Sequence, residues 1–353
     1  MITKKTSLIV GLVLVCNNTC IANANETGLF DMDRWNTITE DIRMRAKKEG
    51  ISDTTIKQTM QAPAFIPSIV KSDKNQSEFK LTMAQYLEKT VNQNRIIQGK
   101  KMRTKYSSLL NRTENIYGIQ PHVILAFWGM ESNYGDVKAR HKLKDAFFTL
   151  IYEGRRKTFF ENQLIALMKT TDKNQQDINN IHGSWAGAMG HFQFIPTTLT
   201  QYGVDGNGDK KIDIINNISD AMASAGNYLN KLGWNKNERI ARRVILPADF
   251  DLKLADGKSK KKLAQWAKMG IKKPDGTPIP ITDMDAGIVA DITTIEQTRN
   301  AVHDAQNAID TDVAPQPVAY AYLTYPNFYR IKKWNNSNWY AIAISELSDA
   351  LRQ

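Results

Sequence analysis

The apolar run VILAFWGM, at residues 123–130, constrains the fold most, because a helix that carries it must bury at least one face. Its spacing predicts a helix over 121–134, with proline in the first turn. Glu131 follows Trp128 by three residues and Phe127 by four, so it lies along the apolar stripe. Such a place disfavours an ionised carboxyl and should raise its pKa, as a general acid requires. The alternative is a structural glutamate that caps a neighbouring helix or pairs with an arginine.

Helical spacing dominates the chain up to Trp234 and predicts a mainly α fold. One helix is expected before Gly50, and two amphipathic helices are expected in 77–118, with a break near Gly99. After Trp234, β-type residues and prolines in 242–254, 277–282 and 317–326 predict a small mixed, β-containing subdomain over 235–325.

Residues 1–24 have the pattern of a secretory signal peptide. Lys4 and Lys5 precede a short apolar run, and small residues stand at positions 22 and 24. The apolar run is too short to span a membrane, and no later transmembrane segment is expected. Both cysteines, Cys16 and Cys20, lie within this segment, so cleavage leaves no thiol for disulfides or metal sites. Lipidation of one of them is an alternative that the residues before them do not favour.

The formal charge of +11 falls to +9 when Lys4 and Lys5 are removed. A basic exported protein suits an anionic polymer such as cell wall, lipid surface or nucleic acid. Nucleic acid is not expected, because no nucleic-acid-binding module is recognisable. The five histidines form no HExxH motif and the chain has no GxSxG motif, so neither zinc nor serine hydrolysis has support.

The stretch HGSWAGAMGHFQFIPTTLTQYG, at 182–203, mixes glycine and alanine with polar and aromatic residues. The small residues permit close backbone approach to a ligand or to another element. The hydroxyl of Ser184 and the amide of Gln193 stand beside Trp185, Phe192 and Phe194, a combination that suits a carbohydrate. Tight helix packing is the alternative.

The stretch DGNGDKKID, at 205–213, resembles the first half of an EF-hand calcium loop. It departs from that pattern because Lys210 replaces the glycine of position 6 and Asn216 replaces the glutamate of position 12. Asp220 is a further oxygen donor, and the alternative is a turn that needs no metal. The candidate ligands are Asp205, Asn207, Asp209, Lys211 and Asp213.

Four segments occur together in the order of a known family: YGIQPHVILAFWGMESNYGD, GSWAGAMGHFQFIPTTLTQYGVDGNGD, SDAMASAGNYLNKLGW and WNNSNWYAIAI. From about Leu29 onward the chain resembles the membrane-bound lytic transglycosylase B family of peptidoglycan enzymes. The resemblance implies a lysozyme-like helical core that cleaves the MurNAc–GlcNAc β-1,4 bond and leaves a 1,6-anhydroMurNAc end. It implies that Glu131 is the single acid and base, assisted by the N-acetyl group of the substrate, unlike the two-carboxylate scheme of most glycosidases.

The same resemblance implies the residues that bind the substrate. Arg155 and Arg156 would meet lactyl or peptide carboxylates, for which guanidinium groups are suited, and their alternative is a solvated helix face. Trp334 stands where a tyrosine is common in the family, and Asn335 after it is retained. The implied substrate-binding residues are Arg155, Arg156, Ser184, Gln193, Tyr228, Asn335 and Tyr340.

The expected organisation has five parts: a signal peptide (1–24), an N-terminal helical region (25–115), a lysozyme-like catalytic core (116–234), the small β-containing subdomain (235–325) and a segment that completes the core (326–353). We expect a periplasmic monomer that acts on glycan strands and works with wall synthesis or remodelling partners. No cofactor is required, although a structural calcium is compatible with the loop. The alternatives are a muramidase and a non-catalytic wall-binding protein.

Overall fold

The computed structural model describes residues 30–75, 81–136, 139–309 and 319–352. The predicted signal peptide lies outside the described residues. The chain divides into two compact units, neither of which is one continuous stretch. The first comprises Met1–Gln76, Lys138–Met189 and Phe194–Gln201; the second comprises Ser77–Val137, Gly190–Gln193 and Tyr202–Gln353. The five-part organisation expected from the sequence stays a prediction.

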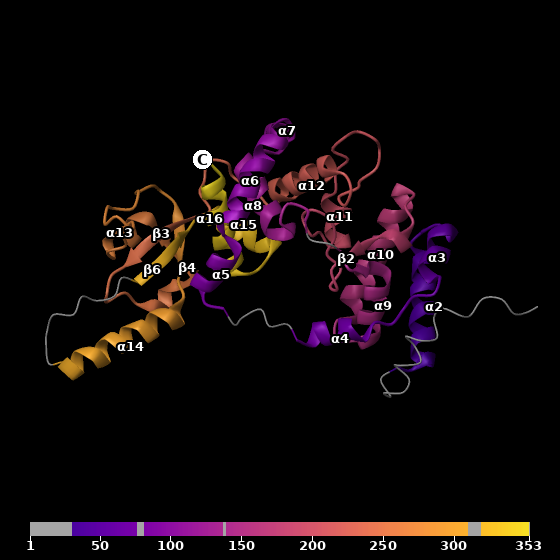
Figure 1. Ribbon diagram of the computed structural model, residues 1–353, viewed down its shortest axis with the longest axis horizontal. Helices are drawn as coiled ribbons and strands as arrows, with labels where there is room; N and C mark the ends of the chain where they lie inside the picture. Colours follow the sequence, from indigo (N-terminus) through magenta and orange to yellow (C-terminus); the bar gives the residue numbers. More distant parts are fainter. Residues whose placement is uncertain (1–29, 76–80, 137–138, 310–318, 353) are drawn as a thin grey trace, which may run out of the picture. The chain divides into compact units, whose positions relative to one another are not determined.

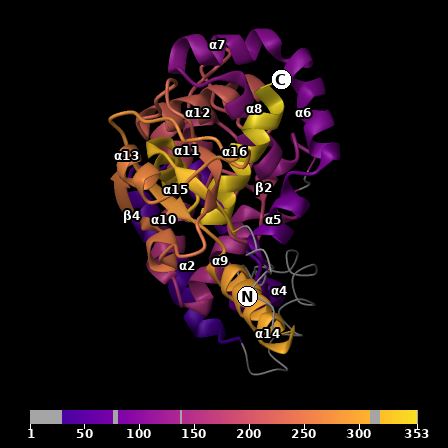
Figure 2. The same cartoon turned by 90° about the vertical axis from the view of Figure 1, so that its left-hand side faces the viewer.

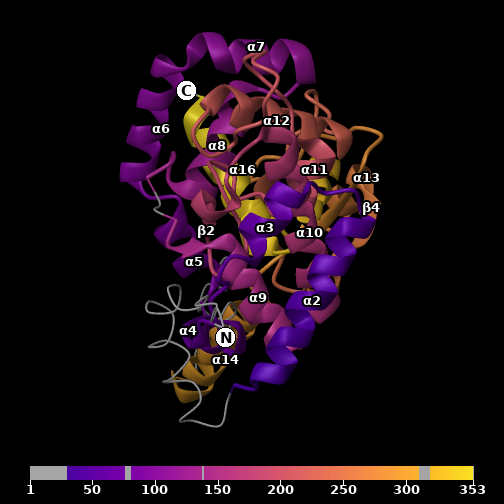
Figure 3. The same ribbon diagram turned by 90° about the vertical axis from the view of Figure 1, so that its right-hand side faces the viewer.

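The first unit is helical and closes around an aromatic cluster. The expected helix before Gly50 is confirmed as α2, which Asp31 caps by accepting hydrogen bonds from two main-chain amides of the first turn. The buried rings of Phe30, Trp35 and Tyr152 pack together, with centroids 5.2–5.9 Å apart. Figure 3 shows α2 and α3 beside α9 and α10. The elements are α2 (Met32–Lys48), α3 (Asp53–Met60), α4 (Pro67–Lys74), β1 (His141–Lys142), α9 (Leu143–Glu153), α10 (Lys157–Asn174), η1 (Ile178–Asn180), β2 (His182–Gly183) and α11 (Pro196–Tyr202).

The helical part of the second unit is built around α8 (Pro121–Ser132), which confirms the helix predicted over the apolar run. Its residues from His122 to Gly129 are all buried. Figure 2 shows α16 beside α8, with α6 on the outside. The other helices are α5 (Met83–Thr90), α6 (Gln93–Lys105), α7 (Ser107–Tyr117), α12 (Ile218–Lys231), α15 (Pro326–Trp334) and α16 (Asn338–Arg352).

The predicted helix break near Gly99 is wrong. Gly99 lies inside α6, and three helices rather than two occupy the segment, with ends near Val91 and Tyr106. The glycine is needed for packing, because a Cβ atom there would stand 2.3 Å from the Tyr134 hydroxyl and 2.6 Å from a methyl carbon of Leu351. In the sequence, a glycine that admits a neighbouring side chain looks the same as a glycine that ends a helix.

The second unit also holds an antiparallel four-stranded sheet of order β3-β6-β5-β4. Trp266 and Ile288 are fully buried in its core. Figure 1 shows α14 (orange) as a long helix below the sheet. The elements are β3 (Ala241–Leu246), η2 (Leu252–Ala255), β4 (Asp256–Lys262), α13 (Leu263–Lys268), β5 (Asp285–Val289), α14 (Ile292–Ile309) and β6 (Ala319–Thr324).

Two of the three stretches with β-type residues contain strands, β3 and β6, and the third does not. Residues 277–282 contain no strand and make only an isolated bridge at Pro278. Pro278 and Pro280 lack the amide hydrogens that a ladder requires. In its place β4 contributes the sequence DGKSKKK, whose charged residues give no apolar alternation.

Across the described ranges, no helix combines the length and the apolar character needed to cross a membrane.

Candidate active site

Glu131 lies in the last turn of α8, one residue before the helix ends, and its side chain is half-buried. One of its carboxylate oxygens, Oε1, accepts both of its hydrogen bonds. Tyr340 on α16 donates through its hydroxyl at 2.5 Å, and Trp334 at the end of α15 donates through its indole Nε1 at 2.9 Å. Three separate helices thus meet at one carboxyl group.

Aromatic rings hold these two donors in place. Phe127, one turn before Glu131 on α8, lies 4.7 Å from the Trp334 ring and 6.2 Å from the Tyr340 ring, measured between centroids. On its other side Trp334 stacks on Tyr228 at 4.8 Å, and Tyr228 stacks on Tyr202 at 4.2 Å. Contacts of this kind fix a ring's orientation, so the indole N–H is aimed before any ligand binds.

Burial raises the pKa of Glu131 from 4.5 to about 7, and the hydrogen bonds from Tyr340 and Trp334 oppose that rise. The predicted upward shift is confirmed. Burial also raises the pKa of Tyr340 well above its ordinary value, so its hydroxyl stays a neutral donor. The alternative, a structural glutamate paired with an arginine, does not apply, because no Lys or Arg among the described residues pairs with Glu131.

The two oxygens of Glu131 have different surroundings. Since Oε1 already accepts two donated hydrogens, the proton of the neutral acid resides on Oε2. Oε2 accepts no hydrogen bond from any residue that the structure describes, and the Glu131 side chain is only half-buried. The carboxyl group can therefore donate a proton outward from Oε2 and hold the resulting charge at Oε1.

Three further predicted residues share the second unit with Glu131. Tyr228 joins the aromatic stack, and its hydroxyl donates to the Lys333 carbonyl at 3.3 Å. Asn335 is exposed and follows α15 directly, where its side chain accepts a hydrogen bond from the Ser337 amide at 3.1 Å. Gln193 has a left-handed backbone (φ 50°) and donates from Nε2 to the Gly190 carbonyl at 2.9 Å.

Ser184 belongs to the first unit. Its hydroxyl accepts the amide of Ala188 at 3.0 Å and so shapes the glycine-rich turn. Gly187 in that turn has φ 95°, and a Cβ there would lie 2.3 Å from the Phe147 ring. Close packing, the alternative raised for this stretch, therefore explains Gly187.

Arg155 and Arg156, also in the first unit, both bind Asp73. The Asp73 side chain is 1% exposed, and each of its oxygens lies 2.5 Å from a guanidinium nitrogen of one arginine. Arg155 also donates to the Asp73 carbonyl at 2.8 Å, and Arg156 lies over the Phe160 ring at 4.8 Å. The two arginines are partly exposed, with 49% and 38% of their side-chain surface accessible, but an internal carboxylate already uses their main donors.

The loop at 205–213 has the backbone turn of a calcium-binding loop, but in the described structure its acidic side chains do not gather around one point. Asp205 accepts the amides of Gly208 at 2.6 Å and Lys210 at 2.7 Å, and Lys210 takes the left-handed conformation (φ 69°) that glycine usually supplies at this position. Asp220, fully buried, accepts the amides of Gly206 at 2.9 Å and Asp213 at 2.7 Å, and so ties the two ends of the loop together. In the described parts of the chain, no three acidic, His or Cys side chains converge closely enough to hold a metal. Asn207 and main-chain carbonyls would have to complete a site.

The hydrogen bond from Trp334 to Glu131 could not be predicted from the sequence. The two residues are 203 positions apart, so no local pattern links them. The only signal is the tryptophan itself, at a position where the resembled family often has tyrosine.

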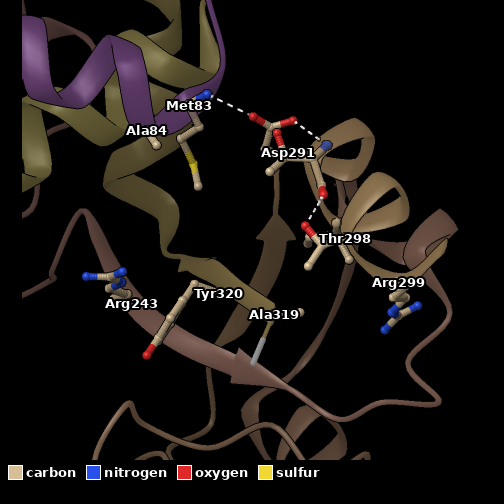
Figure 4. A pocket seen from close by; sticks show the side chains of 10 residues that line it. Met83, Ala84, Arg243, Asp291, Thr298, Arg299, Ala319 and Tyr320 are labelled. Atoms are coloured by element: carbon tan, nitrogen blue, oxygen red, sulfur yellow. Dashed lines mark hydrogen bonds between the residues drawn. The ribbon is translucent and has the colours of Figure 1, made fainter. Parts of the chain in front are cut away.

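A recess of about 210 Å³ lies in the second unit over β3, β6 and α14 (Figure 4). It shares no lining residue with the Glu131 cluster. Figure 4 shows Arg243 and Arg299 at opposite ends, with Tyr320 and Ala319 between them. The one carboxylate in its lining, Asp291, already accepts the amides of Met83 at 2.9 Å and Thr294 at 3.2 Å.

Comparison with known proteins gives one family. Residues 34–349 match the family described as Transglycosylase SLT domain. The Membrane-bound lytic murein transglycosylase B of Escherichia coli (strain K12) is 29% identical over 273 residues, which cover 75% of this chain and 66% of that protein, just under two thirds of its length.

Solved structures agree with this match. SltB3 from Pseudomonas aeruginosa, in complex with NAG-NAM-pentapeptide, superposes with a TM-score of 0.80 at 32% identity and covers 90% of this chain and 79% of that one. The same protein has been solved with NAG-anhNAM-pentapeptide (TM-score 0.79). Escherichia coli Slt35 in complex with calcium gives a TM-score of 0.72 at 26% identity, with 89% of this chain and 92% of that one covered. The expected mainly α, lysozyme-like fold is confirmed.

Proposed function

The chain belongs to the Transglycosylase SLT domain family, and from that premise we propose that it is a lytic murein transglycosylase with Glu131 as its acid and base. It cleaves the MurNAc–GlcNAc β-1,4 bond of peptidoglycan and leaves a 1,6-anhydroMurNAc end. The observation that carries the assignment is the carboxyl group of Glu131, which has a pKa of about 7, no cationic partner among the described residues and both of its hydrogen bonds on Oε1.

The reaction requires one carboxyl group in two protonation states. Glu131 donates the proton on Oε2 to the glycosidic oxygen as the bond between that oxygen and C1 of MurNAc breaks, while the N-acetyl group of the substrate assists at C1. The resulting carboxylate then takes the proton from the C6 hydroxyl as that oxygen bonds to C1. The proton returns to Glu131, and no water is consumed.

The surroundings of Glu131 suit both states. A pKa of about 7 leaves a large fraction of the carboxyl protonated at neutral pH and a competent base after donation. When the charge appears, Tyr340 and Trp334 are already hydrogen-bonded to Oε1, so they stabilise it without rearrangement.

Digestion of purified sacculi, followed by mass analysis of the released muropeptides, tests this function. The proposal expects ends that are lighter by one water than hydrolysed ends. Hydrolysed ends would identify a muramidase instead. Sacculi that are bound but not dissolved by the unaltered chain would identify a non-catalytic wall-binding protein.

We assign the substrate-binding roles by the family resemblance. Gln193, Tyr228, Asn335 and Tyr340 line the sugar site, and their common membership of the second unit with Glu131 supports this. The same resemblance gives Ser184, in the first unit, a substrate-binding role. Arg155 and Arg156 would use their exposed faces for substrate carboxylates, since Asp73 engages their main donors.

We also propose that the loop at 205–213 binds calcium for stability rather than catalysis. The glycine-like turn at Lys210 and the calcium complex of Slt35 support this. Asp205, Asn207, Asp209, Lys211 and Asp213 would supply the oxygens, Lys211 through its main-chain carbonyl. Calcium bound there would hold the loop closed.

Export to the periplasm by residues 1–24 remains our proposal for localisation. The lipid-anchored alternative involves Cys16 or Cys20; the E. coli relative is named a membrane-bound enzyme. A monomeric state and partners in wall synthesis or remodelling belong to the same proposal.

A further inference from the structure

His191 lies in a tight turn that contacts the last turn of α8, the part of the helix that carries Glu131. The turn Gly190–Gln193 belongs to the second unit, as do α8 and Glu131. Two hydrogen bonds to the Gly190 carbonyl close it, one from the Gln193 amide at 3.3 Å and one from the Gln193 side chain at 2.9 Å. The turn therefore presents His191 from a fixed backbone.

The His191 side chain bonds the residue that lies nearly one helical turn before Glu131. Trp128 is 1% exposed, and its indole Nε1 donates to Nδ1 of His191 at 3.1 Å. An indole N–H can only donate, so Nδ1 must offer a lone pair and the ring proton must be on Nε2. The two rings meet edge to face, with centroids 5.5 Å apart. Because a buried indole N–H without an acceptor is costly, the imidazole holds Trp128 in one orientation.

The main chain of His191 bonds the residue directly after Glu131. The Ser132 hydroxyl donates to the His191 carbonyl at 2.6 Å and accepts the Gly135 amide at 3.0 Å. The His191 ring also packs against Gly135, where an added Cβ atom would stand 2.7 Å from two atoms of that ring. His191 thus binds α8 on both sides of Glu131, at positions 128 and 132.

The turn that carries His191 is anchored outside α8. The His191 amide donates to the Ile214 carbonyl at 3.2 Å. Gly190, with φ 72°, lies so close to the same carbonyl that an added Cβ atom would be 2.3 Å from its oxygen. His191 therefore connects the end of α8 to a separate part of the chain.

Glu131 depends on such a connection because its own hydrogen bonds come from other helices. Tyr340 and Trp334 reach Oε1 from α16 and from the end of α15, so a movement of the end of α8 would lengthen both bonds. A displacement of a reacting group by about 1 Å can lower the rate by roughly a hundredfold. The position of the last turn of α8 therefore matters for the reaction.

We propose that His191 is a positioning residue for Glu131. Its Nδ1 and its carbonyl oxygen fix the last turn of α8, so that the carboxyl group stays aligned with the donors of Tyr340 and Trp334. Gln193 lies two residues further along the same turn, so His191 also keeps the proposed sugar site and the acid in one geometry. This inference rests on the proposed function.

Two substitutions separate the ring of His191 from its acceptor atom. His191→Phe keeps a ring but cannot accept the Trp128 hydrogen, whereas the side-chain oxygen of His191→Asn can take the place of Nδ1. With soluble glycan strands as substrate, His191→Phe should lower kcat by at least about tenfold and change KM by less than about twofold. His191→Asn should recover part of kcat.

Nitrogen-15 labelling of tryptophan gives a second measurement, which needs no turnover. The indole signal of Trp128 reports its bond to His191, and the indole signal of Trp334 reports its bond to Glu131. His191→Phe should move both signals, because the end of α8 shifts. His191→Asn should return the Trp334 signal toward its position in the unaltered chain. Trp128→Phe and Trp334→Phe assign the two signals.

His122→Phe is the matched control. His122 is a buried histidine at the other end of α8, so the same substitution tests a general loss of stability in that helix. It should leave kcat and the Trp334 signal unchanged.

The inference is overturned if His191→Phe leaves kcat unchanged, or if only the Trp128 signal moves, since His191 would then support the fold alone. If the unaltered chain released no anhydro ends, the proposed function would fail, while the Trp334 signal would still show whether His191 positions Glu131.

Discussion

Two carboxylates removed from water, one in each unit, have opposite kinds of partner. Asp73 in the first unit is almost wholly buried and meets the guanidinium groups of Arg155 and Arg156. Glu131 in the second unit meets two neutral donors and no cation among the described residues. Removing a carboxylate from water is costly, and only the first arrangement neutralises its charge. The second keeps the proton available, as the acid role proposed for Glu131 requires.

Glu131→Gln should have the largest effect on function. The amide keeps the shape of the side chain but cannot donate an acidic proton, so sacculus solubilisation should fall by at least about a hundredfold. Sacculus binding should persist. Glu88→Gln is the control, since Glu88 is an exposed acid on α5 in the same unit. A Glu131→Gln chain that dissolves sacculi normally would refute the assigned role.

Asp73→Ala should have the largest effect on stability. The substitution leaves the guanidinium groups of Arg155 and Arg156 close together without the carboxylate that both bind. We expect the free energy of unfolding to fall by about 2–3 kcal/mol. The loss is not larger because both arginines are partly exposed to solvent. Denaturant titration measures it.

Asp349→Ala provides the comparison for Asp73. Asp349 pairs with Arg239 at 2.6 Å, but both side chains are more than a third exposed, so the loss should stay below about 1 kcal/mol. Equal losses for the two variants would mean that the burial of Asp73 does not matter.

The raised pKa of Glu131 should be visible in the pH dependence of the free energy of unfolding. Because Glu131 holds its proton up to about pH 7 in the folded chain, the folded state binds more protons than the unfolded state between about pH 4.5 and 7. Its contribution to stability should therefore decline as pH rises through that window and then level off. Glu131→Gln should abolish this decline, which is seen as the difference between the two pH profiles of unfolding. Parallel profiles would contradict the raised pKa.

Tyr340→Phe should shift the pH dependence of cleavage. The hydrogen bond from Tyr340 lowers the pKa of Glu131, so its loss should raise that pKa by roughly half to one unit, and the decline of activity at high pH should move upward equally. Tyr322→Phe is the control, since Tyr322 bonds another glutamate, Glu346, in the same unit. If the decline of activity moved to lower pH instead, the Tyr340 hydroxyl would not be lowering the pKa of Glu131.

Trp334→Phe should produce a smaller shift in the same direction, because the indole bond is longer and Tyr340 remains. Trp234→Phe removes a similar indole donor, bonded to Gln120 at 3.0 Å, and should leave the pH profile unchanged. If Trp334→Phe and Trp234→Phe gave the same pH profile, the hydrogen bond from Trp334 would not affect the pKa of Glu131.

The central helix and its acid could be predicted from the sequence, because spacing along one helix decides which face Glu131 shares with Phe127 and Trp128. The partners of Glu131 could not, since Trp334 and Tyr340 reach it from 203 and 209 residues away. For the same reason the sequence does not reveal Asp73 as the partner of Arg155 and Arg156. Local sequence also misleads at Gly99 and β4, because their roles depend on residues far away in the sequence. Gly99 makes room for the hydroxyl of Tyr134, and β4 forms by pairing with β5.

Direct titration of the Glu131 side chain tests the central claim. Carbon-13 labelling of glutamate, with the Glu131 signal assigned by its absence in Glu131→Gln, gives the pKa of that carboxyl in the folded chain. The account predicts a midpoint of about 7. A midpoint near the ordinary value of 4.5 would mean that the group is charged at neutral pH and has no proton to give.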